Sequence, residues 1–128
     1  MKVIFLKGRH NCGKTTTLNL LYDALKENSE IIEPRRELPG REDFECVLKY
    51  NNKKIAIFSL GDYWFAPGAA IGYYAKAKCD ILVVAYSLGK YIHNNELFKL
   101  YCKQDPEIVE KEGLKDEEAL KKLIEKIG

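Results

Sequence analysis

The sequence predicts an α/β fold: a three-layer, doubly wound, mostly parallel sheet of about five strands with one antiparallel hairpin. Short apolar runs rich in β-branched and aromatic residues alternate along the chain with segments whose leucines recur at helical spacing. This alternation is typical of a parallel sheet with helices on both faces. The hairpin is indicated by two such runs that are joined by the tight-turn signal Asn51–Lys54.

The first strand and the first helix follow one another directly. Lys2–Lys7 is a mostly apolar run, which predicts a buried strand. Thr15–Glu27 predicts a helix whose inward residues are Leu18, Leu21, Tyr22 and Leu25.

The next segment contains the hairpin. Glu30–Glu33 fits a short strand or a loop, and Pro34–Arg41 is predicted to be a loop because it is rich in proline and charge. Asp43–Tyr50 and Ile55–Phe58 are the two strands of the hairpin. The first of these strands has an apolar face made of Phe44, Cys46, Leu48 and Tyr50.

The second half of the chain continues the alternation. A helix is expected from about Gly68 to Lys78, and Cys79–Tyr86, the most hydrophobic run, predicts a central strand. Asn94–Lys103 predicts a helix, Pro106–Glu110 a last strand and Asp116–Ile127 an amphipathic helix. The two helices are expected to pack through Leu97, Leu100 and Tyr101, and through Leu120, Leu123, Ile124 and Ile127, respectively.

Length and composition limit the classes of protein. The 128 residues fit one domain, and 46% hydrophobic residues suffice for a buried core. A net charge of +2 gives no reason to expect dedicated nucleic-acid binding. No apolar run is long enough for a transmembrane helix, and the N-terminal run is too short for a signal peptide.

The four cysteines are far apart and form no C-x-x-C pair, which favours a reducing cytoplasm over a zinc site or a disulfide framework. Cys46 and Cys79 lie in or beside apolar runs and are interpreted as packing residues. Cys12 is either a small residue at a variable loop position or a thiol whose pKa is lowered by a helix N-terminus.

The segment Gly8–Thr15 has the pattern G-x-x-x-x-G-K-[ST], with a predicted strand before it and a predicted helix after it. Gly8 and Gly13 allow backbone conformations and close approaches that a β-carbon hinders. The intervening N–H groups can then surround anionic phosphates at the helix N-terminus. The pattern therefore predicts a site for phosphate groups.

Each polar residue of this loop has an expected role. Lys14 supplies a flexible positive charge for the β- and γ-phosphates, and Thr15 supplies a hydroxyl ligand for Mg²⁺. Asn11 tolerates the left-handed bend, Cys12 occupies a variable position, and the N–H group of Thr16 adds to the phosphate contacts.

The segment from about Lys2 to Glu27 resembles the P-loop NTPase superfamily. This resemblance implies the P-loop NTPase fold and binding of a nucleoside triphosphate with Mg²⁺. It does not imply a reaction, because the superfamily includes kinases, GTPases, ATPases and inactive binding modules.

A P-loop NTPase also needs an acidic group at the carboxyl end of a neighbouring strand. Asp62 follows Ile55–Phe58 at the correct end, and Gly61 gives room beside a γ-phosphate. Asp62 is therefore expected to hold Mg²⁺, directly or through water, or to orient the attacking water. Asp80 precedes its strand and is expected to make a turn hydrogen bond.

The order of elements resembles the first half of a Ras-like GTPase, with two departures. The position of that family's metal aspartate holds Phe58, and Ser87–Lys90 replaces the Asn-Lys-x-Asp guanine signature. ATP is therefore favoured over GTP, and both remain open.

Three functions follow from this pattern. The first is a small cytoplasmic protein that binds Mg·ATP (or GTP) and hydrolyses it slowly, with Lys14 and Asp62 as catalytic residues. The second is a small-molecule or nucleotide kinase whose acceptor is held by Arg35, Arg36 or Arg41. The third is a non-catalytic nucleotide-dependent switch with a protein partner at the loops of residues 34–41 and 63–68, where Tyr63–Phe65 either stack on a ligand or pack.

Overall fold

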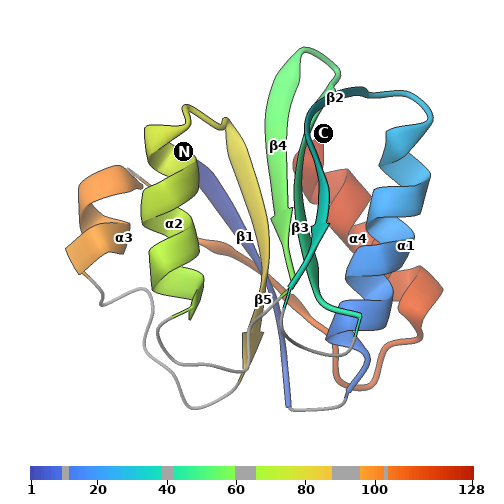
Figure 1. Cartoon of the computed structure of the whole chain (residues 1–128). Coiled ribbons are helices and arrows are strands. Elements are labelled where there is room, and N and C mark those ends of the chain that lie inside the picture. Colours follow the sequence, from blue (N-terminus) through green and yellow to red (C-terminus); the bar gives the residue numbers. More distant parts are fainter. Residues whose placement is uncertain (10–11, 39–41, 60–65, 88–95, 103) are drawn as a thin grey trace.

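A computed structural model of the chain describes residues 1–9, 12–38, 42–59, 66–87, 96–102 and 104–128, and for 66–68 and 96–98 it describes the backbone only. These residues form three layers, with one sheet between two pairs of helices (Figure 1). The α/β class and the mostly parallel sheet predicted from the sequence are confirmed.

Within the described ranges the sheet has six strands, in the order β2-β3-β4-β5-β1-β6. Their bounds are β1 Lys2–Gly8, β2 Glu30–Glu37, β3 Phe44–Tyr50, β4 Lys53–Phe58, β5 Ile81–Ser87 and β6 Glu107–Glu110. Strands β4, β5, β1 and β6 run parallel, whereas β3 is antiparallel to both β2 and β4. The expected β3–β4 hairpin is therefore present, and β2 adds a second antiparallel pairing.

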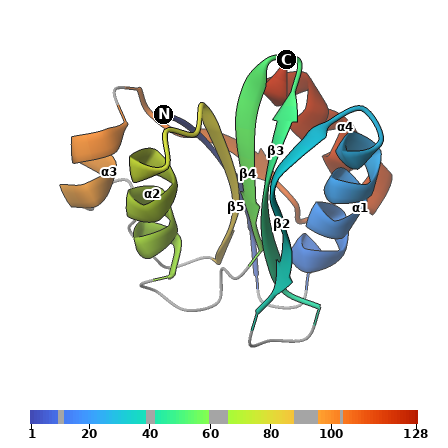
Figure 2. The same cartoon turned by 45° about the horizontal axis from the view of Figure 1, so that its top comes forward.

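In the part of the chain that the structure describes, two helices cover each face of the sheet. Helices α1 and α4 lie on one face and α2 and α3 on the other, as Figures 1 and 2 both show. Their bounds are α1 Lys14–Lys26, α2 Ala66–Lys76, α3 Glu96–Tyr101 and α4 Asp116–Ile127. No helix in the described part of the chain is long and apolar enough to cross a membrane.

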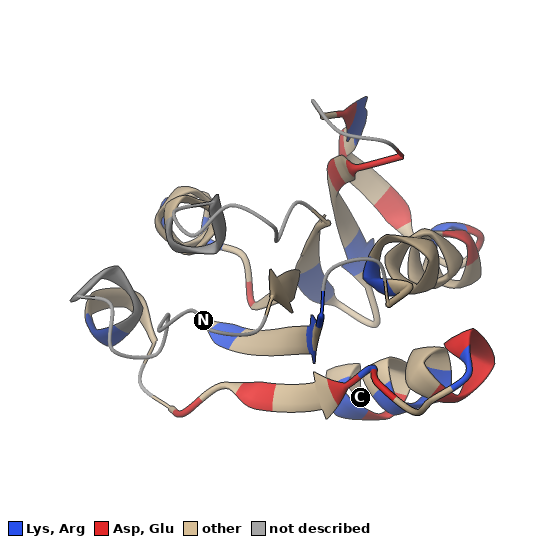
Figure 3. Ribbon diagram, turned by 90° about the horizontal axis from the view of Figure 1, so that it is seen from below, with Lys and Arg blue, Asp and Glu red and all other residues tan. Residues whose placement is uncertain are grey.

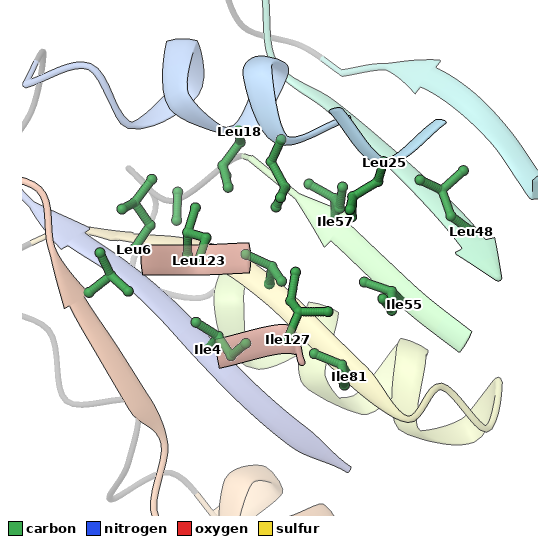
Figure 4. Close-up of a cluster of buried hydrophobic side chains, with 14 of the residues drawn as sticks. Ile4, Leu6, Leu18, Leu25, Leu48, Ile55, Ile57, Ile81, Leu123 and Ile127 are labelled. Atoms are coloured by element: carbon green, nitrogen blue, oxygen red, sulfur yellow. The ribbon is translucent and has the colours of Figure 1, made fainter. Parts of the chain in front are cut away.

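The apolar residues of the strands divide between the two faces because side chains alternate along a strand. Ile4 and Leu6 of β1 pack with Leu18 of α1 and Leu123 of α4 in one cluster (Figure 4). Val3 and Phe5 face the other way and pack with Ile71 and Tyr74 of α2. Such two-sided burial explains why β1 and β5 are almost continuously apolar.

Several expectations about single elements need correction. The sheet has six strands rather than about five, and β2 continues through Pro34–Glu37, where a loop was predicted. This strand is an exposed edge with register shifts, which is where proline and charged residues are tolerated in a sheet. Leu100 of α3 is 71% exposed, so its expected packing role is wrong.

Other packing predictions are confirmed. Phe44, Cys46 and Leu48 are buried on the face that packs against α1 and α4, with Tyr50 beside them. Cys79 is buried on the opposite face. In α4, Leu123 and Ile127 are buried with Ala119, while Leu120 and Ile124 pack at the edge of the cluster.

Candidate functional site

One edge of the sheet collects the residues that carry chemistry. The parallel strands β1, β4, β5 and β6 end at this edge, and α1 begins there directly after β1 (Figure 1). Figure 3 views the molecule from this end, with the sheet between its two helical layers. Because β3 is antiparallel, its first residue, Phe44, lies at the same edge as Ser59, which follows β4. The edge therefore gathers residues that follow parallel strands and residues that precede an antiparallel one.

The N-terminus of α1 is shaped by Gly13. Its backbone is left-handed, with φ 98° and ψ 18°, which a glycine adopts without a β-carbon clash. No side chain among the described residues caps this helix end, and its first turn contains no acidic residue. The first turn of a helix leaves N–H groups without intrahelical acceptors, so this end suits an anion. By contrast, α4 begins with three acidic residues, Asp116, Glu117 and Glu118.

Lys14 is buried within this loop, with only 6% of the residue exposed. Its ammonium donates hydrogen bonds to the carbonyl oxygens of Gly8, at 3.0 Å, and Arg9, at 2.6 Å. No carboxylate among the described residues forms an ion pair with it. The loop therefore holds a buried positive charge that is hydrogen-bonded to backbone carbonyls without a described negative partner.

Thr15 forms a hydroxyl and carboxylate cluster with two residues of the hairpin. Its Oγ1 donates to Oδ1 of Asp43 at 3.0 Å, and Oγ of Ser59 donates to the same oxygen at 2.9 Å. The Ser59 hydroxyl in turn accepts the N–H of Phe44 at 2.8 Å. Asp43 is 7% exposed, and no described lysine or arginine forms an ion pair with it.

Asp43 was missed from the sequence because only two acidic residues beside strands were considered. Asp62 follows a predicted strand, and Asp80 precedes a predicted parallel strand. Asp43 had been placed inside the hairpin strand, which begins one residue later. The signal that would have found it was the hairpin itself. An antiparallel strand brings the residue before it to the edge where its neighbour ends.

The connection between β6 and α4 forms a second wall of the loop, which the sequence did not indicate. Lys111 is 5% exposed, and its ammonium contacts Oδ1 of Asp116 at 3.1 Å and the carbonyl of Leu114 at 2.8 Å. The same Asp116 oxygen lies 3.5 Å from Oγ1 of Thr17 in α1. A β-carbon built on Gly13 would lie 3.1 Å from it. This pair therefore packs directly behind the glycine.

The neighbouring residue of that connection contacts the loop from its outer side. One carboxylate oxygen of Glu112 accepts the backbone N–H of Arg9 at 3.0 Å and pairs with its guanidinium at 3.2 Å. The C-terminal quarter of the chain thus helps to fix the loop that begins at residue 8.

Some predicted site residues cannot be placed. Asn11, Gly61, Asp62, Arg41 and the aromatic segment 63–65 lie outside the described residues. The proposed partner loop of residues 63–68 lies outside them as well, apart from the helical backbone of 66–68. Their roles stay predictions.

Asp80 has the structural role expected of it. Its Oδ2 accepts the N–H of Lys54 at 2.8 Å, at the opposite edge of the sheet from the loop. The residue thus ties the start of β4 to the start of β5.

Two of the three arginines considered for an acceptor are held on β2. The guanidinium of Arg35 stacks 4.1 Å from the centre of the Phe44 ring and pairs with Glu37 at 2.9 Å. Arg36 pairs with Glu45 on the other face of the strand. Residues 34–37 of the proposed partner loop are thus part of an edge strand.

The thiols differ in exposure. Cys12 is half-buried in the loop, with Sγ 4.0 Å from Nζ of Lys14. Burial raises the pKa of Cys46 to about 12 and that of Cys79 to about 11, and it also raises the pKa of Cys102. The three buried thiols are therefore neutral packing groups at physiological pH.

No group of three or more histidine, cysteine, aspartate or glutamate side chains among the described residues is arranged to hold a metal ion. An oxygen site that uses hydroxyls, phosphates and water does not require such a group. Comparison of the chain with protein-family models, with curated proteins and with solved structures finds no match.

Proposed function

We propose that this chain binds the phosphate groups of a nucleoside triphosphate, with Mg²⁺, in the loop Gly8–Thr15. The observation that carries the proposal is the buried ammonium of Lys14, held by carbonyl oxygens at a helix N-terminus that lacks acidic residues. A buried charge is costly without an opposite partner, and the described residues supply none to Lys14, so an anionic ligand would stabilise this arrangement.

The residues of the loop fit the parts of a triphosphate. The first-turn N–H groups of α1, which include those of Lys14, Thr15 and Thr16, have no intrahelical acceptors and would donate to phosphate oxygens. Lys14 would exchange its carbonyl partners for the β- and γ-phosphates, where it neutralises charge on the group that is transferred. The Thr15 hydroxyl would provide one oxygen ligand to Mg²⁺.

The proposed reaction is slow transfer of the γ-phosphoryl group to water in the cytoplasm. Asp62 remains the proposed residue that orients the attacking water or holds a metal-bound water. Arg35 and Arg36, the two described arginines outside the loop, pair with Glu37 and Glu45 on β2. An arginine directed at the transferred phosphoryl group contributes several orders of magnitude in rate in related chemistry, so slow turnover is proposed. ATP is the proposed nucleotide, with GTP as the alternative that the first experiment compares.

Nucleotide binding is tested by thermal unfolding and calorimetric titration with Mg·ATP, Mg·GTP and the two diphosphates. Stabilisation by at least one of them is expected, and Lys14→Met should abolish it. Lys26→Met serves as the matched control because it removes a lysine from the exposed end of the same helix. Absence of binding by every nucleotide would refute the proposal.

A non-catalytic switch is the second candidate, and contacts between α1 and the segment before β3 favour it. Thr15 contacts Asp43, and the amide of Asn19 donates to the carbonyl of Glu42 at 3.3 Å. The N–H of Leu38, just after β2, donates to the carbonyl of Asp43 at 2.9 Å. Phosphate release separates the candidates: a hydrolase turns over more than one nucleotide per protein, whereas a switch binds without turnover.

A further inference from the structure

The buried carboxylate of Asp43 has surroundings that are unusual for a negative charge. Both of its described side-chain partners are hydroxyl groups, those of Thr15 and Ser59, and both donate to the same oxygen, Oδ1. The side chain is more than nine-tenths buried, and no described lysine or arginine pairs with it. Buried carboxylates are ordinarily paired with a cation or coordinate a metal.

We propose that Asp43 is the carboxylate of the divalent-cation site, which it forms together with Thr15. The inference rests on the proposed function, because the remaining ligands would be phosphate oxygens and water. Asp62 was the acidic residue expected at this site. Asp43 is a second one, and its contact with Thr15 lies among the described residues.

The direction of the hydrogen bond supports this assignment. Thr15 donates its only hydroxyl proton to Asp43, so the lone pairs of its oxygen point elsewhere and remain available to a cation. Ser59 fixes the carboxylate from the other side, and its own oxygen is fixed by the N–H of Phe44. Such supporting hydrogen bonds orient the groups that bind a metal.

The oxygens left over by these hydrogen bonds suit a small cation. Oδ1 of Asp43 accepts both hydroxyl protons, which occupies its two lone pairs, so Oδ2 is the carboxylate oxygen that would bind the cation. Oγ1 of Thr15 would supply a second oxygen ligand. The cluster contains only oxygen atoms, which is the ligand type that Mg²⁺ and Mn²⁺ prefer.

The sheet explains why this carboxylate is held firmly. The backbone N–H of Ser59 donates to the carbonyl of Phe44 at 3.0 Å, which ties the end of β4 to the start of β3. Asp43 is therefore positioned by paired strands on one side and by the first turn of α1 on the other.

The test uses Asp43→Asn, which removes the charge and keeps an oxygen that accepts the two hydroxyl protons. Binding of non-hydrolysable ATP and GTP analogues is measured by calorimetry in EDTA and in Mg²⁺, and bound Mn²⁺ is counted directly by electron paramagnetic resonance. Asp80→Asn is the matched control, since its carboxylate also accepts a hydrogen bond but lies at the opposite edge of the sheet.

The expected result is a separation of nucleotide affinity from metal affinity. In EDTA, Asp43→Asn should bind the analogue about as tightly as the wild type, whereas in the nucleotide complex its Mn²⁺ affinity should fall about 10–100-fold. Asp43→Glu keeps the charge, so Mg²⁺ should still strengthen binding of the analogue, but by less than in the wild type. This variant is used if Asp43→Asn does not fold.

The outcomes distinguish the two claims. If the wild type binds the analogue and Mn²⁺ and Asp43→Asn matches it in both, the assignment of Asp43 is overturned and the proposed function stands. An equal loss of Mn²⁺ in Asp80→Asn would also overturn the assignment. If the wild type binds no nucleotide, the proposed function is refuted and the assignment falls with it.

Discussion

Replacing Gly13 by alanine tests how the loop is held in its left-handed conformation. At φ 98°, an L-residue with a β-carbon costs about 1–2 kcal/mol more than glycine. The added methyl group would also lie 3.1 Å from Oδ1 of Asp116 and 3.4 Å from Nζ of Lys111. Crowding of this kind in a packed site adds about 1 kcal/mol or more.

These free energies convert to a change in melting temperature. At about 2.1 cal/mol/K per residue, 128 residues give an unfolding entropy of about 0.27 kcal/mol/K. A loss of about 2–3 kcal/mol therefore lowers the Tm of Gly13→Ala by about 7–11 °C. Calorimetry or circular dichroism measures this shift without any ligand.

Gly113→Ala is the matched control. Gly113 also has a positive φ, 79°, but no atom lies within 4 Å of a β-carbon built on it. The Tm of Gly113→Ala should fall by only about 4–7 °C, because this variant pays the cost of a positive φ without the steric crowding. Its nucleotide affinity should persist. If Gly13→Ala loses no more stability than Gly113→Ala, the assigned contact with Lys111 and Asp116 is wrong. Adding Asp116→Ala should reduce the extra loss in Gly13→Ala.

Three further predictions concern the same regions. Asp116→Asn leaves the buried ammonium of Lys111 without its half-exposed carboxylate, so the unfolding free energy should fall by about 1.5–3 kcal/mol, as for loss of a hydrogen bond to a charged group. Denaturant titration should show a lower midpoint, and an unchanged midpoint would contradict the pairing. A thiol reagent at pH 8 should modify Cys12 first in the folded protein, because Cys12 is the more exposed thiol. A buried thiol with a pKa of about 11, such as Cys79, is only about 0.1% ionised at that pH. Cys12→Ser should remove the fast phase of the reaction, and a fast phase that persists would contradict the assignment to Cys12. The raised pKa of Cys46 means that the unfolded chain releases the thiol proton at a lower pH than the folded chain does. The stability that this thiol contributes is therefore fully present below about pH 9 and is lost between about pH 9 and pH 12. The unfolding free energy falls there by up to about 1.4 kcal/mol per pH unit. Urea titrations of wild type and Cys46→Val should therefore diverge with rising pH, and parallel curves would contradict this.

Most of the fold follows from local patterns. The apolar runs of β1 and β5 and the leucines of α1 predict their elements because each must bury a face of known period. For the edge strand β2, the sequence left Glu30–Glu33 open between a short strand and a loop and predicted a loop beyond it. Pro34 and the charges that follow it are typical of loops, and they are tolerated in β2 because one side of the strand has no neighbour.

The loop Gly8–Thr15 could be selected from the sequence because its chemistry depends on neighbours in the chain. A strand, two glycines, a lysine and a helix start are all set by local order, which is why Gly13 and Lys14 were predicted with their roles. The partners of that loop come from distant segments, and no spacing in the sequence connects them. Lys111 and Asp116 reach it because β6 pairs with β1 and α4 packs against α1.

The sequence by itself therefore determined that the chain is an α/β protein with a loop of phosphate-binding pattern between β1 and α1. Only the tertiary structure placed Asp43 against Thr15. The position of a side chain across a sheet depends on strand order and direction, which are fixed by long-range packing. The antiparallel β3, whose start lies where β4 ends, brings that carboxylate to the loop from 28 residues away.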